Sequence, residues 1–243
     1  MYHAEVRPDG VHAVSLGPTT AIFLDRRALP FGADPERLAA LLAQLLNGPV
    51  PVLIPEQRHT ATVFTFSGKK PQPGPLFVGV CDALITGERG VALAVQTADC
   101  LPVALLATDT VAVIHAGWRG LAAGILQKTV ALLSAQFGAR PESVAATVGV
   151  GIGACHYPVG PEVIKALARQ LGTEDGFVTG NSVHLAAFAR LALQRAGLLA
   201  ENIAILEGCT ACNQNYYSYR RDGDNAGRQW TAVVVGGVPP ATD

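Results

Sequence analysis

Three short segments place an imidazole or a thiol at the end of an apolar run. They are Gln57-Arg58-His59, Thr97-Ala98-Asp99-Cys100-Leu101-Pro102 and His115-Ala116-Gly117-Trp118-Arg119-Gly120. Sites are often built where buried strands end in polar, reactive side chains. A catalytic zinc takes three N or S ligands and keeps a fourth position open. His59, Cys100 and His115 are therefore candidate ligands of one zinc ion, which would hold the Cys100 thiol deprotonated.

The spacing of these residues leaves two other interpretations open. Separations of 41 and 15 residues match no short metal-ligand signature, so each histidine could be a hydrogen-bonded structural residue. Alternatively, Cys100 and His115 form a nucleophile pair without a metal, with Asp99 as the group that orients it.

The segment from Gly117 to Gly120 is also suited to an anion. It leads into a helix expected over Leu121–Phe137, and the N-terminus of a helix favours negative charge. The guanidinium of Arg119 has the two-pronged geometry that phosphate and carboxylate accept. We predict an anion site at Gly117 and Arg119, with more distant cations at Arg220, Arg221 and Arg228. The alternative is that Arg119 only solvates the helix start.

A glycine-rich segment and a cysteine pair give weaker signals. The glycines at 149, 151 and 153 lack the Gly-x-Gly-x-x-Gly spacing of a dinucleotide turn, so we expect a loop that approaches a ligand closely. Cys209-Thr-Ala-Cys212 is a single C-x-x-C with neither a second pair nor a helix beginning at its first cysteine. We interpret it as structural, not as half a zinc ribbon or a redox pair.

The segment 216–228 is dense in aromatic residues and arginines. It could stack a base or hold a phosphate. The alternative is a surface turn held by an ion pair between Arg221 and Asp222.

The elements that must position these residues are short strands and four helices. Alternating or β-branched runs predict strands over Val11–Leu16, Ala61–Phe66, Val91–Thr97, Val103–Leu106, Val111–His115, Val144–Val150, Ile203–Leu206 and Thr231–Val235. Caps and apolar periodicity predict helices over Pro35–Leu46, Leu121–Phe137, Pro161–Leu171 and Leu185–Arg195. We expect segment 67–75 to be a long hairpin loop and the tail 236–243 to fray. Strands and helices mix without strict alternation, which favours an α+β fold with mixed sheets.

Composition narrows the class of protein. The chain has 243 residues, 49% of them hydrophobic and 15% charged, which fits one large domain or two small ones and excludes global disorder. The net charge of −1 argues against nucleic-acid binding and against a polybasic membrane anchor. No apolar run reaches membrane-spanning length, and the first residues lack signal-peptide architecture, so we expect a cytoplasmic protein. Five cysteines are an odd number, which argues against a disulfide framework.

Taken together, these segments resemble the laccase-domain family, whose members include bacterial purine nucleoside phosphorylases and the peptidoglycan editing factor. The family was formerly described as multicopper polyphenol oxidases. The resemblance begins near residue 52 and continues to the C-terminus. It is carried by Gln57-x-His59, Asp82-Ala-Leu-Ile-Thr86, Thr97-Ala-Asp-Cys-Leu-Pro-Val103, His115-Ala-Gly-Trp-Arg-Gly120, Gly151-Ile-Gly153, Tyr157-Pro-Val-Gly160, Cys209-Thr210, Tyr217-Ser-Tyr-Arg-Arg-Asp-Gly223 and Gly227-Arg228.

The resemblance implies a fold, a metal and an activity. The implied fold is a single α+β domain over 1–243, similar to the catalytic domain of cytotoxic necrotizing factors. Its mixed sheets pack face to face in α/β/β/α layers, and its N-terminal segment 1–50 is divergent here. The implied cofactor is one zinc per chain on His59, Cys100 and His115. The implied activity is phosphorolysis of adenosine, inosine, guanosine and methylthioadenosine with inorganic phosphate as co-substrate, together with adenosine deamination.

The sequence departs from the family pattern at two places that concern substrate binding. The family's Asn-Arg pair in the first helix is replaced by Ala40-Leu41. If that arginine contacts substrate in the family, either Arg26, Arg27 or Arg58 replaces it here or activity is reduced. Thr60 stands where the family usually has glycine after Gln-x-His.

Three other functions compete with the zinc-dependent phosphorylase. A Cys/His amidohydrolase editing peptidoglycan precursors would use Cys100 and His115 without a metal. A non-enzymatic binding module is supported only by the lost Asn-Arg pair. A copper polyphenol oxidase would need many histidines in His-x-His pairs, whereas the chain has six histidines and no such pair.

Overall fold

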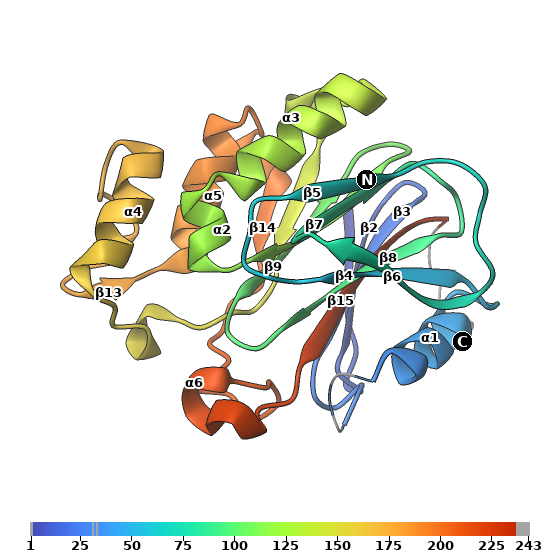
Figure 1. The fold of residues 1–243 in the computed structure, drawn as a ribbon, viewed down its shortest axis with the longest axis horizontal. Coiled ribbons are helices and arrows are strands. Elements are labelled where there is room, and N and C mark those ends of the chain that lie inside the picture. Colours follow the sequence, from blue (N-terminus) through green and yellow to red (C-terminus); the bar gives the residue numbers. More distant parts are fainter. Residues whose placement is uncertain (1, 31, 33, 237–243) are drawn as a thin grey trace.

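Two mixed β-sheets lie face to face at the centre of the molecule (Figure 1). The computed structural model describes residues 2–30, 32 and 34–236. The first sheet has the order β1 (Tyr2–Val6), β2 (Val11–Leu16), β3 (Thr19–Leu24), β15 (Gln229–Val235), β8 (Ala92–Thr97), β4 (Pro51–Glu56), β6 (Gly74–Val80). The second has the order β14 (Ile203–Ile205), β11 (Ala145–Val148), β9 (Leu101–Leu106), β10 (Val111–Ala116), β7 (Ala83–Thr86), β5 (Val63–Phe66). A small third sheet pairs β12 (Val178–Thr179) with β13 (Ser182–Val183).

Three clusters of buried apolar side chains fill the space between neighbouring layers of sheets and helices. The central cluster lies between the sheets and includes Phe23 and Leu93 of the first sheet and Leu106 and Val113 of the second. The outer face of the second sheet is covered by α3 (Ile125–Phe137) and α5 (Leu185–Arg195) together with the short helix α2 (Trp118–Ala122), and α4 (Pro161–Leu171) packs against α2. The outer face of the first sheet is covered by α1 (Pro35–Leu45), on the other side of the molecule (Figure 1). The predicted α+β fold with face-to-face mixed sheets and flanking helices is confirmed.

The predicted helices form, and they begin and end near the predicted capping residues, with one exception. Asp34 caps α1 through its side chain, and Gly172 ends α4 in the left-handed conformation. The single helix predicted over 121–137 is wrong, because it is two helices. The first, α2 (Trp118–Ala122), is separated from α3 by Gly124 at φ 78°. A left-handed residue cannot continue a right-handed helix, and glycine adopts that conformation without strain.

Segment 67–75 is not a hairpin loop as predicted. The strands on either side of it, β5 and β6, belong to different sheets, so the segment crosses from one sheet to the other. Local patterns mark strands and loops but do not report which strands pair. Strands β1, β3, β4, β6, β7, β12 and β13 also form outside the predicted set. Residues 237–243 of the tail that was expected to fray lie outside the described residues.

Strand pairing brings the three reactive segments to one edge. Strand β4 runs parallel to β8, so the residues that follow both strands lie at the same end of the first sheet. After β8 the chain crosses to the second sheet at residues 98–100 and enters β9. Strand β10 is antiparallel to β9, with His115 opposite Pro102. The end of β10 therefore lies beside the start of β9, next to Cys100.

No helix in the described part of the chain is both long and apolar enough to cross a membrane.

Candidate metal centre

The side chains of His59, Cys100 and His115 converge. Their donor atoms all lie within 4.8 Å of one another, and Cys100 Sγ is 3.7 Å from His59 Nε2. The two imidazole rings meet edge to face, with centroids 4.7 Å apart. His59 follows β4, Cys100 lies at the crossover between the sheets, and His115 is near the end of β10. The structure thus brings together the three residues that the sequence selected.

Asp82 holds two of these three residues in place. One carboxylate oxygen lies 2.8 Å from His115 Nδ1 and accepts a hydrogen bond from the His59 backbone N–H at 3.0 Å. The other accepts from the Thr60 backbone N–H at 2.6 Å and the Thr60 hydroxyl at 2.7 Å. Asp82 is fully buried. A carboxylate behind a ligating histidine fixes the orientation of its ring and leaves the far nitrogen, here Nε2, facing the ligand.

Asp82 belongs to one of the sequence motifs, but the sequence pattern assigned it no role. The signal that could have found it was a carboxylate directly before the wholly buried strand β7, because a buried charge requires a partner.

Asp99 was the carboxylate expected to orient the Cys100–His115 pair, and that expectation is wrong. Its oxygens accept from the Thr210 hydroxyl at 2.5 Å and the Arg220 backbone N–H at 2.6 Å.

The charges in this group stabilise one another. Burial alone would raise the pKa of Asp82, but hydrogen bonds from His115 and Thr60 lower it to about 2. Burial works against the charged form of His115, yet the bonds to Asp82 and Cys100 raise its pKa to about 9. Burial likewise opposes ionisation of Cys100, while the nearby imidazoles of His115 and His59 lower its pKa to about 6. Without a metal, the group therefore favours a thiolate beside an imidazolium at neutral pH.

Two residues near the centre adopt left-handed backbone conformations. His59 has φ 58° and Asp99 has φ 87°, which is uncommon for residues with side chains. The hydrogen bonds of Asp82 to the His59 backbone and of Asp99 to Thr210 and Arg220 hold these turns. Such strained turns persist only where surrounding contacts fix them, and they are common at functional sites.

Gly117 is required by the space around the donors. A Cβ atom at this position would lie 2.8 Å from His59 Cδ2 and 3.0 Å from Cys100 Sγ. Both distances are shorter than ordinary carbon contacts. The absence of a side chain is what lets the chain leave β10 directly against His59 and Cys100.

The three donors open into a cavity of about 470 Å³. It lies between the sheet ends and the segment that carries α6 (Tyr219–Asp222). Its remaining walls mix aromatic, amide and cationic side chains with small apolar residues and one carboxylate: Pro55, Gln57, Gln96, Thr97, Ala98, Asp99, Ile152, Tyr157, Tyr219, Arg220 and Arg228. Gln57 is fixed to the first sheet, since its amide exchanges hydrogen bonds of 2.7 and 2.8 Å with the Gln96 backbone.

The predicted cations divide into two groups. Arg220 and Arg228 line the cavity. The guanidinium of Arg220 stacks 5.3 Å from the ring centroid of Tyr157 and donates to the His156 carbonyl at 3.1 Å. Arg119 is exposed and stacks on its neighbour Trp118, with the guanidinium carbon 4.5 Å from the ring centroid. An anion site at Gly117 and Arg119 stays a prediction.

Arg221 serves the loop itself. It pairs with Asp222 at 2.7 Å and donates to the carbonyls of Thr210 and Tyr216. This is the ion pair expected from the surface-turn interpretation of segment 216–228. The loop nevertheless also supplies Tyr219, Arg220 and Arg228 to the cavity wall, and base stacking or phosphate binding by these residues stays a prediction.

The arginines proposed to replace the missing Asn-Arg pair have other partners. Arg27 pairs with buried Asp25 at 2.6 Å, and Arg58 pairs with Glu56. Arg26 lies over the Tyr217 ring at 5.4 Å. Among the described residues that line the cavity, the cations are Arg220 and Arg228, so these are the better candidates for the substrate contact.

The donor set fits a zinc ion. Two imidazoles and one thiolate are borderline-soft ligands that zinc prefers, and three ligands from the protein leave a position for water or substrate. The carboxylate of Asp82 behind His115 supplies the usual support for a ligating imidazole. A low pKa at Cys100 favours the thiolate that a metal requires.

A second group of metal-type donors is present in the described residues. It consists of Cys155, His156, Cys209 and Cys212, whose donor atoms also lie within 4.8 Å of one another. In the sequence, Cys209 and Cys212 stand as an isolated pair because nothing local connects them with residues more than fifty positions away.

The glycine-rich loop, expected to approach a ligand closely, approaches other parts of the chain. A Cβ on Gly151 would meet Leu101 and the Asp99 carbonyl, and a Cβ on Gly153 would meet Cys209.

Comparison with known proteins shows the family and the fold of this chain. The family model described as multi-copper polyphenol oxidoreductase laccase matches residues 33–236, so the chain belongs to this laccase-domain family. A purine nucleoside phosphorylase of Corynebacterium glutamicum is 34% identical over 204 residues, covering 82% of this chain and 81% of that protein. Adenosine deaminase RL5, from an unknown prokaryotic organism, is 34% identical over 161 residues, covering 63% of this chain and 61% of that protein.

The fold matches solved structures along nearly the whole chain. The structure of YlmD from Geobacillus stearothermophilus superposes with a TM-score of 0.82 and 24% identity. The match covers 96% of this chain and 99% of that one. The layered fold is therefore shared with that protein, including the N-terminal part where the sequence resemblance is weakest.

Proposed function

We propose that this protein is a zinc-dependent purine nucleoside phosphorylase that also deaminates adenosine. The observation that carries the proposal is one cavity in which the three-donor group, two arginines and two tyrosines meet. The relatives named purine nucleoside phosphorylase and adenosine deaminase support the same assignment. The ligands of the metal would be His59, Cys100 and His115. The proposed substrates are adenosine, inosine, guanosine and methylthioadenosine, in the cytoplasm.

Phosphorolysis transfers the ribosyl group from a purine nitrogen to phosphate. The bond between C1′ and the base breaks, an oxygen of phosphate bonds to C1′, and the base leaves with a proton. The chain must therefore hold an anion beside C1′ and stabilise charge on the departing base. We expect Arg220 and Arg228, which line the cavity, to bind that phosphate, because guanidinium groups match its geometry.

The two tyrosines are suited to the purine. Tyr157 and Tyr219 line the same cavity, and their faces offer the flat apolar surface on which a base stacks. Burial and the Cys100 charge raise the pKa of Tyr157 to about 12, although Arg220 and Arg119 work against that rise. The phenol of Tyr157 is therefore protonated at neutral pH and can act as a hydrogen-bond donor.

Zinc, when bound, supplies a Lewis acid that polarises an oxygen or activates water, which is the chemistry deamination at purine C6 requires. The protein residues do the rest: Asp82 sets the orientation of His115 and the turn of His59, while Asp99 holds the backbone of Arg220. Removal of the metal should therefore abolish deamination while the fold persists, since the large core does not depend on a metal.

The test is base release with phosphate titrated from zero. A phosphorylase should release hypoxanthine from inosine only when phosphate is supplied, with ribose 1-phosphate formed in equal amount. Adenosine should also yield inosine without phosphate, in proportion to bound zinc. Phosphate-independent base release would contradict the phosphorylase assignment, and no reaction with any of the four nucleosides would contradict the purine assignment.

A Cys/His amidohydrolase acting on peptidoglycan precursors is the second candidate. The observation in its favour is the chain of contacts from Asp82 to His115 to Cys100, with a thiol pKa lowered to about 6. A thiolate beside a histidine oriented by a carboxylate is the arrangement of a cysteine nucleophile. The metal separates the two candidates, because zinc would occupy the same thiolate. Precursor hydrolysis that rises when zinc is removed would favour the amidohydrolase.

A further inference from the structure

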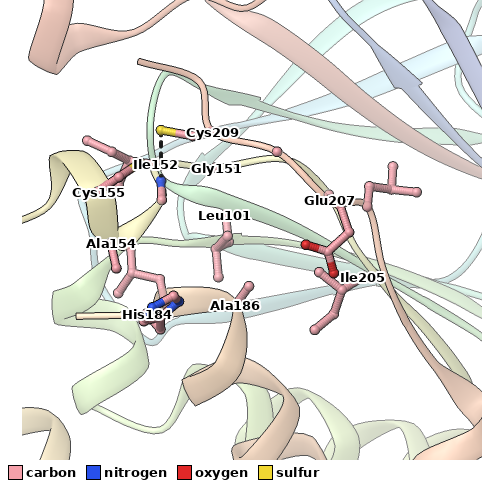
Figure 2. A pocket seen from close by; sticks show the side chains of 15 residues that line it. Leu101, Gly151, Ile152, Ala154, Cys155, His184, Ala186, Ile205, Glu207 and Cys209 are labelled. Carbon is pink, nitrogen blue, oxygen red and sulfur yellow. Dashed lines mark hydrogen bonds between the residues drawn. The ribbon is translucent and has the colours of Figure 1, made fainter. Parts of the chain in front are cut away.

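The cluster of Cys155, His156, Cys209 and Cys212 lies outside the catalytic cavity and has no part in the proposed reaction. It sits on two loops that follow β11 and β14. These strands are parallel neighbours, with Val148 opposite Ile205, so the segments that follow them leave the second sheet at the same edge. Figure 2 shows Cys155 and Cys209 together at the wall of a separate cavity of about 370 Å³.

The distances within the cluster match those around one tetrahedral ion. His156 Nδ1 lies 3.3 Å from Cys155 Sγ, 3.3 Å from Cys212 Sγ and 3.9 Å from Cys209 Sγ. The sulfurs of Cys155 and Cys212 are 3.6 Å apart. Zinc with bonds of about 2.3 Å to sulfur and about 2.0 Å to nitrogen separates two sulfurs by about 3.8 Å and a sulfur from a nitrogen by about 3.5 Å.

Two further contacts favour a metal over a disulfide. One imidazole nitrogen faces three sulfurs at once, whereas a disulfide joins two sulfurs and needs no such nitrogen. The Gly153 backbone N–H donates to Cys209 Sγ at 3.1 Å (Figure 2), as expected for a sulfur that carries negative charge. Cys209 is buried while the other three ligands are exposed, so an ion has a path to the site from solvent.

We propose that Cys155, His156, Cys209 and Cys212 bind a second zinc ion, as a closed structural site of three thiolates and one imidazole. Such sites have four protein ligands and no open position, which distinguishes this one from the three-ligand catalytic centre. The expected metal content thus becomes two ions per chain instead of one. The cysteine pair that stands isolated in the sequence is half of this site.

The second zinc would join two loops that support the catalytic cavity. The Ile152 backbone N–H donates to the Asp99 carbonyl at 2.8 Å, and the Thr210 hydroxyl donates to the Asp99 carboxylate. The Thr210 backbone N–H also donates to the Gly151 carbonyl at 3.0 Å. The loops thus meet at the residue that precedes Cys100, and the ion would fix their relative position.

The experiment measures zinc content in variants that separate the two sites. Cys100→Ser should remove the catalytic ion and keep the other, whereas Cys155→Ser and Cys212→Ser should each remove only the second. X-ray absorption at the zinc edge of Cys100→Ser should show three sulfurs and one nitrogen around the ion. Cys81→Ala is the matched control, because Cys81 belongs to neither group and should leave both ions bound.

Measurements of folding distinguish loss of the zinc site from failure of the variant to fold. Each variant is checked by circular dichroism, and zinc is added back to metal-free Cys100→Ser and to the double variant Cys100→Ser/Cys212→Ser. The ion should raise the melting temperature of the first and not of the second. Cys100→Ser protein that binds no zinc, or a Cys155–Cys212 disulfide in freshly purified zinc-free protein, would overturn the proposal. Neither result would affect the phosphorolysis assay, so the two proposals fail independently.

Discussion

The Nδ1 atom of His115 lies 2.8 Å from a carboxylate oxygen of Asp82, and both side chains are buried. The same carboxylate accepts the His59 backbone N–H, so one residue positions two of the three candidate zinc ligands. We expect Asp82→Asn to weaken zinc binding at this centre about 10- to 100-fold. Competition with a chelator of known affinity measures the change. Asp109→Asn, on the exposed surface, is the control, and equal zinc affinity in both variants would contradict this role for Asp82.

The same pair predicts how the stability of the metal-free protein depends on pH. The folded-state pKa of Asp82 is lowered to about 2, so its stabilisation is complete above about 4 and is lost as pH falls through about 2. The folded-state pKa of His115 is raised to about 9, so its stabilisation is complete below about 6 and is lost as pH rises through about 9. Urea unfolding of metal-free protein across this range should show both limits. In Asp82→Asn the loss at low pH should be smaller.

Cys100 should react as a thiolate at unusually low pH once the metal is removed. Its pKa of about 6 lies well below the ordinary value of 9.0, because the imidazoles of His115 and His59 outweigh the effect of burial. Alkylation of Cys100 in the metal-free protein, followed peptide by peptide with mass spectrometry, should have its midpoint near pH 6. The midpoint should move upward in His115→Ala. An ordinary thiol titration in the parent protein would show that the three side chains are arranged differently in solution.

Gly117→Ala should disrupt the metal centre with little effect on the rest of the fold. The new Cβ would lie 2.8 Å from His59 Cδ2 and 3.0 Å from Cys100 Sγ, so at least one ligand must move. We expect loss of the catalytic zinc and of activity, measured by metal analysis and nucleoside assays. Gly87→Ala is the matched control, since a Cβ there meets nothing closer than 3.4 Å. Full zinc content in Gly117→Ala would contradict the close packing of this site.

Phosphate binding should depend on the arginines that line the cavity. Arg220→Ala and Arg228→Ala should each raise the KM for phosphate at least about tenfold, since a hydrogen bond to a charged group is worth about 1.5–3 kcal/mol. Arg119→Ala tests the alternative anion position at the start of α2. A larger effect from Arg119→Ala than from the two cavity variants would place the phosphate there. Arg221→Ala should act mainly on stability, because its guanidinium holds the loop carbonyls.

Local sequence signals were enough to determine several elements. Asp34 followed by proline indicated the start of α1, and proline and glycine marked the two ends of α4. These signals work because caps act within one helical turn. The residue types of His59, Cys100 and His115, at the ends of apolar runs and within recognisable motifs, also indicated the metal centre.

The tertiary structure alone decided which distant residues meet. Nothing near Asp82 in the sequence indicates that it contacts His115, and nothing near Cys209 indicates His156. Both contacts follow from strand pairing: β7 beside β10, and β14 parallel to β11. Strand pairing depends on cross-strand contacts and on which faces are buried, and these join residues far apart in the chain. The sequence by itself therefore indicated the candidate ligands of one site. The order of strands in the sheets decided the position of Asp82 behind His115 and brought the second cluster together.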